Sequence, residues 1–263
     1  MKKTKVLVLA AGQGTRLRPI TNDIPKCLVP LLGTSLLERQ ISTLNNAGID
    51  DIHIATGYRK EQLEVFGYGT SYNPRYFETN MVESLFSAME FIRKEGGDLI
   101  IAYGDIVYQQ SNLQTLLACD EDIALMIDKG WRDLWSKRLE NPLDDAETLV
   151  MEPNGYITEL GKKPDSYDNI QGQYTGLIKI KSNKIEDLVT FYQQLDRDVT
   201  YDGKDFDNMY MTSFLQLLID SGWKVKAAEV QHGWLEIDSV DDLEHYHEMA
   251  KSGELDQFYK VEA

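Results

Sequence analysis

The sequence predicts an α/β fold with a Rossmann-like, mixed but mainly parallel sheet that is flanked by helices. Apolar runs rich in β-branched residues recur along the first half, capped amphipathic segments lie between them, and the first run leads directly into a glycine-rich loop. Alternating apolar strands and helices form parallel sheets covered on both faces, with right-handed crossovers. Ligands bind beyond the carboxyl ends of such strands, so we expect functional residues directly after Leu9, Thr56 and Tyr103.

Strands and helices are expected in alternation along the first half. The expected strands are residues 5–9, 51–56, 98–103 and 123–127. A first helix is expected from Ser35, which forms a capping box with Glu38, to the stop at Gly48. Two more are expected at residues 80–96 and 111–119.

The second half has a more mixed pattern. Strands are expected at residues 155–160, 173–180, 224–230 and 234–237, and helices at residues 183–195, 208–220 and from about Val240 onward. No stretch rich in Pro, Gly or Ser separates the halves, so we expect a single domain over residues 1–263.

Composition excludes several classes of protein. The 263 residues include 43 acidic and 27 basic ones, a net charge of −16, which disfavours binding to nucleic acid. Two cysteines are too few for a disulfide framework. The longest apolar runs are far shorter than the roughly 20 residues of a membrane span, and the N-terminus lacks a signal-peptide core. We expect a cytoplasmic protein that binds no membrane.

The loop after the first strand has a pattern typical of phosphate binding. Residues 6–19 read VLVLAAGQGTRLRP, in which glycines let backbone N–H groups approach phosphate oxygens and arginines supply positive charge. A P-loop requires Lys after its last glycine, where this chain has Thr15 and Arg16. A dinucleotide-binding loop requires a third glycine where this chain has Leu17, which argues against an NAD-dependent oxidoreductase.

The stretch LAAGQGTRLRPITNDIPKCLVP closely resembles the signature of nucleotidyltransferases, which join a nucleoside triphosphate to a phosphorylated acceptor and release pyrophosphate. The resemblance implies that Arg16 meets the β and γ phosphates and that Lys26 binds the α phosphate and the acceptor phosphate. The nucleotide-binding residues it implies in this loop are Leu9, Ala10, Ala11, Gly12, Gly14, Thr15 and Arg16. The alternative is an ordinary turn with solvated arginines.

The same resemblance implies a metal site at two aspartates. Asp105 follows the strand at residues 98–103 in a Gly-Asp pair, and Asp238 lies in a W-x-E-I-D stretch; both match the metal-binding aspartates of the family. Mg²⁺ suits a site of few carboxylates and phosphates. The family's catalytic residues would then be Arg16, Lys26 and Asp105. The alternatives are a polar strand end for Asp105 and a helix cap for Asp238.

The resemblance also implies where the base binds, and it divides the chain into parts. The implied base contacts are Gly57, Tyr58, Thr79, Asn80 and Ser84. The alternative for Asn80 is that it serves only as a helix cap. Residues 1–127 would form the nucleotide-binding part, and residues 128–263 the acceptor-binding part with the second metal ligand.

Four stretches, residues 79–86, 128–149, 172–177 and 205–220, resemble the small cytidylyltransferases whose acceptors are not sugars: phosphoglutamine, phosphocholine and aminoethylphosphonate. This likeness implies CTP as the nucleotide and a role in cell-surface polysaccharide biosynthesis. The implied acceptor contacts are Lys26, Trp131, Arg138, Glu147, Lys162 and Lys163. Trp131 and Trp135, four residues apart, would stack on a ligand from one helix face, and core packing is their alternative. Solvent exposure is the alternative for the two lysines.

Other functions remain open at this stage. A sugar 1-phosphate uridylyl- or thymidylyltransferase would use the same chemistry, and a non-catalytic nucleotide-binding module would use the same fold. The presence of Arg16, Lys26, Asp105 and Asp238 together favours an enzyme. A homodimer is left open.

Overall fold

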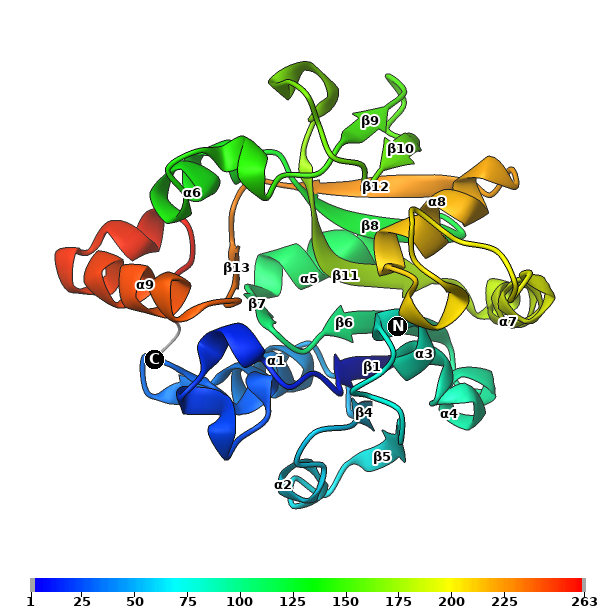
Figure 1. Ribbon diagram of the computed structural model, residues 1–263, viewed down its shortest axis with the longest axis horizontal. Helices are drawn as coiled ribbons and strands as arrows, with labels where there is room; N and C mark the ends of the chain where they lie inside the picture. The colour runs from blue at the N-terminus through cyan, green and yellow to red at the C-terminus, as the bar shows by residue number, and fades with distance from the viewer. Residues whose placement is uncertain (1–2, 262–263) are drawn as a thin grey trace.

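A seven-stranded sheet runs through the centre of the computed structural model, which describes residues 3–261 (Figure 1). Its strands are β1 (Thr4–Ala10), β4 (Asp51–Thr56), β5 (Gly69–Tyr72), β6 (Asp98–Tyr103), β8 (Ile123–Asp128), β11 (Gln173–Ile180) and β12 (Val225–Val230). Their order across the sheet is β12-β8-β11-β6-β1-β4-β5. The sheet therefore draws strands from both halves of the chain.

The sheet is mainly parallel, as the sequence predicts. The pairs β6–β1, β1–β4, β4–β5 and β8–β12 are parallel. Only β11 runs against its neighbours β6 and β8. The carboxyl ends of β1 and β6, adjacent and parallel, consequently open at the same edge of the sheet.

Hydrophobic cores cover both faces because alternate residues of a strand point in opposite directions. In β1, Val6 and Val8 belong to one core, and Leu7 and Leu9 to the other. The first core is completed by helices α1 (Leu36–Asn46), α5 (Gln110–Ala118), α6 (Trp131–Arg138) and α9 (Val240–Ser252). The second is completed by α3 (Met81–Phe86), α4 (Met89–Arg93), α7 (Ile185–Gln194) and α8 (Met211–Asp220).

The expected helices form with one correction. The capping box of Ser35 and Glu38 starts α1 as predicted. The segment expected as one helix over residues 80–96 is two short helices, α3 and α4, which part at Ala88, where φ and ψ leave the helical region. The sequence also did not indicate the short helix α2 (Glu61–Glu64) or the edge strand β5.

Three two-stranded sheets complete the fold. They pair β2 (Pro30–Leu31) with β3 (Thr34–Ser35), β9 (Leu149–Met151) with β10 (Ile157–Leu160), and β7 (Ile106–Tyr108) with β13 (Trp234–Glu236). The β7–β13 pair joins the end of β6 to the start of α9. No helix within residues 3–261 is long and apolar enough to cross a bilayer.

Candidate active site

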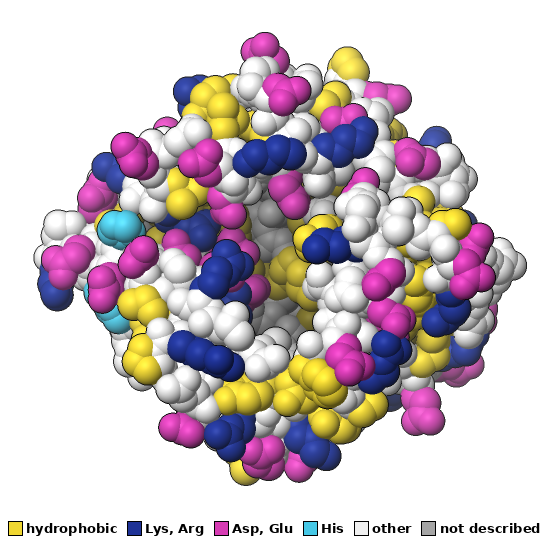
Figure 2. Space-filling model, viewed as in Figure 1, with side chains coloured by type: hydrophobic (Ala, Val, Ile, Leu, Met, Phe, Trp, Pro, Cys, Tyr) yellow, Lys and Arg dark blue, Asp and Glu magenta, His cyan; other side chains and the backbone are white. Residues whose placement is uncertain are grey.

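A cleft of about 360 Å³ lies at the carboxyl edge of the sheet, where the sequence predicts ligand binding. Basic and acidic side chains border a hollow near the centre of this face (Figure 2). The lining residues are Leu9, Ala10, Ala11, Gly12, Gly14, Thr15, Arg16, Lys26, Cys27, Tyr76, Thr79, Asn80, Met81, Ser84, Tyr103, Gly104, Asp105, Glu236 and Asp238. All seven loop residues from Leu9 to Arg16 that were expected to bind nucleotide are among them.

The glycine-rich loop is shaped by Gly14 and opened by Gly12. Gly14 has a positive φ of 63°, and its carbonyl accepts a hydrogen bond of 2.6 Å from the Thr21 hydroxyl. A Cβ on Gly14 would stand 3.0 Å from Cβ of Lys26, whereas a Cβ on Gly12 would meet no atom within 4 Å. The loop thus packs on the segment that carries Lys26 and leaves open space on its cleft side.

The two predicted metal aspartates meet at Lys26. The Lys26 ammonium lies 2.7 Å from Asp105 Oδ2 and 2.6 Å from Asp238 Oδ1, and Arg16 also pairs with Asp238. Pairing of β7 with β13 brings the two acids together across 133 residues of sequence, since Ile237 donates its N–H to the Asp105 carbonyl at 3.0 Å. The structure therefore brings into contact the four residues that the sequence predicts to be catalytic or to bind metal: Arg16, Lys26, Asp105 and Asp238.

Glu236 adds a third carboxylate that the sequence analysis missed. Burial above all, with Asp105 and Asp238 nearby and against the opposing charge of Arg138 and Lys26, raises the pKa of Glu236 to about 8. Burial opposes protonation of Lys26, but Asp105 and Asp238 outweigh it and raise the pKa of the ammonium above its usual value. Glu236 is the last residue of β13 and lies two residues before Asp238, so its closeness in sequence to a predicted metal ligand was an available signal.

The carboxylates fit a metal whose remaining ligands come from a substrate. Asp105 Oδ1 is buried and accepts no hydrogen bond from any residue of the described chain. Within residues 3–261 no three His, Cys, Asp or Glu side chains form a group ready to hold a metal by themselves. Mg²⁺ is commonly held by one or two carboxylates together with phosphates and water, which is the donor set available here.

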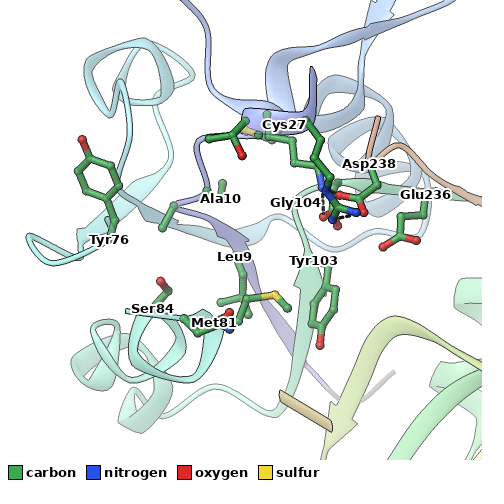
Figure 3. Close-up of a pocket in the computed structure, with 18 of the residues that line it drawn as sticks. Leu9, Ala10, Cys27, Tyr76, Met81, Ser84, Tyr103, Gly104, Glu236 and Asp238 are labelled. Carbon is green, nitrogen blue, oxygen red and sulfur yellow. Dashed lines mark hydrogen bonds and ion pairs between the residues drawn. The ribbon is translucent and has the colours of Figure 1, made fainter. Parts of the chain in front are cut away.

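The other side of the cleft carries the expected base contacts. Thr79, Asn80 and Ser84 line it, and Asn73 donates hydrogen bonds to the hydroxyls of Thr79 (3.0 Å) and Ser84 (3.1 Å). Asn80 is also the cap of α3, as the alternative held. In Figure 3, Tyr76 and Ser84 lie on one side of the loop, and Glu236 and Asp238 on the other. The cleft thus has an uncharged polar side and a charged side.

Gly57 and Tyr58 support the loop from behind and do not line the cleft. The Tyr58 N–H donates to the Ala11 carbonyl at 3.1 Å. A Cβ on Gly57 would stand 2.6 Å from the same carbonyl oxygen and 2.6 Å from Cβ of Tyr76. Gly57 therefore lets the loop and Tyr76 pack closely together.

The structure does not support ligand stacking by Trp131. Trp131 and Trp135 are 4% and 3% exposed and pack edge to face in the core, with Trp135 against Trp234 as well. Core packing, the alternative, is what the structure shows. Arg138 likewise does not direct its guanidinium into the cleft, because that group is buried against Asp242.

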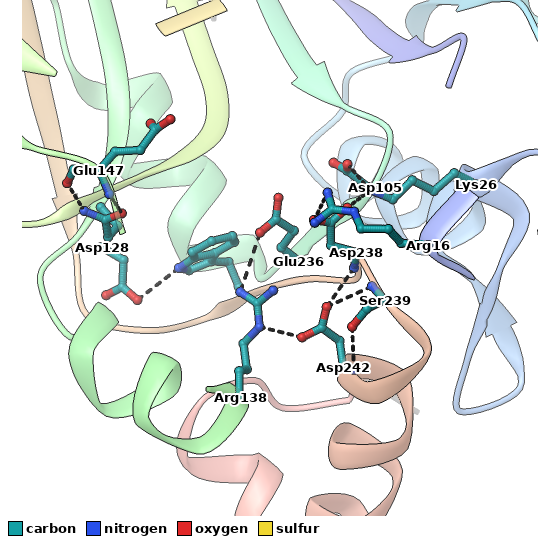
Figure 4. Close-up of polar contacts among 12 residues, drawn as sticks. Arg16, Lys26, Asp105, Asp128, Arg138, Glu147, Glu236, Asp238, Ser239 and Asp242 are labelled. Atoms are coloured by element: carbon teal, nitrogen blue, oxygen red, sulfur yellow. Dashed lines mark hydrogen bonds and ion pairs between the residues drawn. The ribbon is translucent and has the colours of Figure 1, made fainter. Parts of the chain in front are cut away.

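The remaining acceptor candidates lie outside the cleft lining. Lys162 pairs with Glu159 at 2.6 Å, and Lys163 donates to the carbonyls of Leu143 and Asp144 at 2.8 Å each. The Glu147 carboxylate makes no described hydrogen bond, and Figure 4 shows it directed away from the backbone pairing with Gln173. Burial, and then Asp145, raise the pKa of Glu147 to about 7.

Several cleft residues had no signal in the sequence. Gly104 directly follows Tyr103, where functional residues were expected, but Cys27, Tyr76, Met81 and Tyr103 also line the cleft, and each of these four is of a type common in any core or turn. Their place follows from chain paths that only the folded structure defines.

Comparison with known proteins identifies the family. The family model of the MobA-like NTP transferase domain matches residues 6–157, more than half of the chain. The chain belongs to this family. Enzymes of this class transfer a nucleotidyl group from a nucleoside triphosphate, and the chain is a nucleotidyltransferase.

Individual relatives show a more specific similarity than the family model does. The chain is 46% identical over 248 residues to a CTP:phosphoglutamine cytidylyltransferase of Campylobacter jejuni, covering 90% of this chain and 97% of the relative. It is 43% identical over 90 residues to a choline-phosphate cytidylyltransferase of Streptococcus pneumoniae, covering 33% and 39%.

Solved structures share the fold. An inositol-1-phosphate CTP transferase from T. maritima aligns with a TM-score of 0.74 at 21% identity, covering 99% of this chain and 98% of that one. The phosphocholine cytidylyltransferase of Streptococcus pneumoniae aligns with a TM-score of 0.70 at 23% identity, covering 94% and 99%. Both likenesses agree with the predicted nucleotidyltransferase fold.

Proposed function

We propose that the chain transfers CMP from CTP to a small phosphorylated or phosphonate acceptor, with phosphoglutamine as the first candidate, and releases pyrophosphate. The observation that carries this proposal is the meeting of Arg16, Lys26, Asp105 and Asp238 beside the glycine-rich loop. The 46% identity with a phosphoglutamine cytidylyltransferase supports the choice of nucleotide and acceptor. One domain of 263 residues carries the reaction in this proposal.

The reaction needs charge neutralisation more than proton transfer. An oxygen of the acceptor phosphate attacks the α phosphorus, the bond from the α phosphorus to the bridging oxygen breaks, and pyrophosphate leaves. The attacking oxygen is already anionic, so no general base is required. Lys26 neutralises charge at the α and acceptor phosphates, and Arg16 at the β and γ phosphates.

Magnesium belongs to this proposal. Asp105 and Asp238 would hold Mg²⁺ between the protein and the phosphates, where it supplies further neutralisation of negative charge. Thr79, Asn80 and Ser84 would contact the base. Glu147, Lys162 and Lys163 remain acceptor contacts of the proposal, although they do not line the cleft, because the resemblance to the small cytidylyltransferases implies them.

Pyrophosphate release tests the proposal. The purified chain with Mg²⁺ is incubated with CTP, UTP, dTTP or ATP and with phosphoglutamine, phosphocholine, 2-aminoethylphosphonate or glucose 1-phosphate. We expect the fastest release with CTP and phosphoglutamine. Preference for UTP or dTTP with glucose 1-phosphate would replace the proposal by its sugar alternative, and nucleotide binding without release for every pair would leave a non-catalytic module.

A further inference from the structure

Arg138 is a buried arginine that joins the acceptor half of the chain to the charged side of the cleft. It is the last residue of α6, and its side chain is 3% exposed. Its guanidinium lies 4.9 Å from the centre of the Trp135 ring, and its Nη1 is 3.5 Å from Glu236 Oε2. That nitrogen is buried and donates no hydrogen bond within residues 3–261.

Asp242 connects Arg138 to Asp238. One oxygen of Asp242 accepts a hydrogen bond of 2.8 Å from Arg138 Nε. Its other oxygen accepts the backbone N–H groups of Asp238 at 3.0 Å and Ser239 at 2.9 Å (Figure 4). A single buried carboxylate therefore ties the backbone of Asp238 to the arginine.

Arg138 thus contacts both acids of the segment that enters the cleft, Glu236 directly and Asp238 through Asp242. We propose that Arg138 is a positioning residue for the carboxylates of Glu236 and Asp238. This inference rests on the proposed nucleotidyl transfer, in which Asp238 holds the metal. Groups that orient metal ligands in this way contribute roughly 10- to 100-fold to metal affinity or activity.

A merely structural arginine of the same burial is available for comparison. As whole residues, Arg39 in α1 is 9% exposed and Arg138 8%, and within residues 3–261 Arg39 donates from Nε and Nη2 to the Leu31 carbonyl alone, at 3.2 and 2.7 Å. It contacts neither Asp242 nor the acids of the cleft. Arg39→Met therefore removes a buried guanidinium without altering the carboxylates.

The test compares Arg138→Met, Arg138→Lys and Arg39→Met with the unmodified chain. Mn²⁺ affinity is measured by electron paramagnetic resonance in the presence of CTP, and hydrogen exchange by mass spectrometry of the peptide that holds Asp238 and Ser239. We expect Arg138→Met to weaken Mn²⁺ binding about 10- to 100-fold and to speed exchange in that peptide. Arg138→Lys should recover part of both, and Arg39→Met should change neither.

The outcomes separate this inference from the proposed function. Unchanged Mn²⁺ affinity and unchanged exchange in Arg138→Met would overturn it. If Arg138→Met does not fold, Arg138→Lys takes its place, because an ammonium cannot contact Asp242 and Glu236 together as the planar guanidinium does, and unchanged values of the same two readouts in that variant would overturn the inference. Absence of pyrophosphate release from the unmodified chain would contradict the proposed function alone, since exchange is measured without turnover.

Discussion

Lys26 stands where the proposed metal would contact Asp105 and Asp238, so its replacement should raise metal affinity in the absence of nucleotide. The Lys26 side chain is 15% exposed and its ammonium is within 2.7 Å of both carboxylates. Unit charges about 4 Å apart interact by about 4 kcal/mol at an effective dielectric constant of 20. A divalent ion beside the ammonium would meet about twice that repulsion, unless the lysine moved away.

Movement of the flexible lysine relieves most of this repulsion. What remains is the loss of its charged hydrogen bonds, which contribute about 1.5–3 kcal/mol in proteins. At about 1.4 kcal/mol per tenfold change in affinity, Lys26→Met should bind Mn²⁺ about 10- to 100-fold more tightly without CTP. Its turnover should nevertheless fall, since the proposed neutralisation of the α phosphate is lost.

The assay is a titration of the nucleotide-free protein with Mn²⁺, in which the electron paramagnetic resonance signal reports the concentration of unbound Mn²⁺. Arg16→Met is the matched control because Arg16 pairs with Asp238 only and its side chain is 67% exposed. Exposed ion pairs contribute about 0–1 kcal/mol, so the control should change affinity by less than about fivefold. Equal or weaker Mn²⁺ binding by Lys26→Met would refute the reasoning that the ammonium and the metal compete.

Three further predictions concern Asp105 and Gly104 in the cleft and Glu147 outside its lining. Asp105→Ala should fold but lose at least about 100-fold in Mg²⁺-dependent pyrophosphate release; near-normal turnover would exclude Asp105 as a metal ligand. Gly104→Ala should lower both the melting temperature and turnover, because its Cβ would stand 2.6 Å from the Leu9 carbonyl oxygen, and unchanged values of both would contradict that packing. Glu147 has a pKa of about 7, above its usual value, because of burial and then Asp145, so the folded state holds a proton that the unfolded state releases and its stability falls as pH rises from about 4.5 to 7. Glu147→Gln should therefore gain stability over the unmodified chain at pH 8, on the order of 1–3 kcal/mol, and little at pH 4.5, as urea unfolding at the two pH values would show; an equal difference at both would count against the raised pKa.

Local pattern in the sequence determined the core of the fold. Apolar runs predicted strands such as β1 and β6 because period and composition reflect burial on both faces. The Ser35 capping box predicted the start of α1 because a cap depends on residues three apart. Because ligands bind at the carboxyl edge of a parallel sheet, the sequence alone predicted that Asp105 and the glycine-rich loop lie at the same edge.

Tertiary structure decided which residues pack against each face of a helix. Periodicity placed Trp131 and Trp135 on one side of a helix but did not reveal that Trp234, about a hundred residues later, would bury that side. The guanidinium of Arg138 could bind a carboxylate of a ligand as well as the carboxylate of Asp242. The packing of α6 against α9 decides that it binds Asp242.

The sequence by itself thus determined the strands and the glycine-rich loop, because these depend on neighbours along the chain, and its resemblance to nucleotidyltransferases pointed to the charged residues of the proposed reaction. Only the tertiary structure decided that Asp105, Glu236 and Asp238 share one side of the cleft. That arrangement depends on the antiparallel pairing of β7 with β13, and the free energy of such a long-range pairing comes from contacts that no local window of sequence contains.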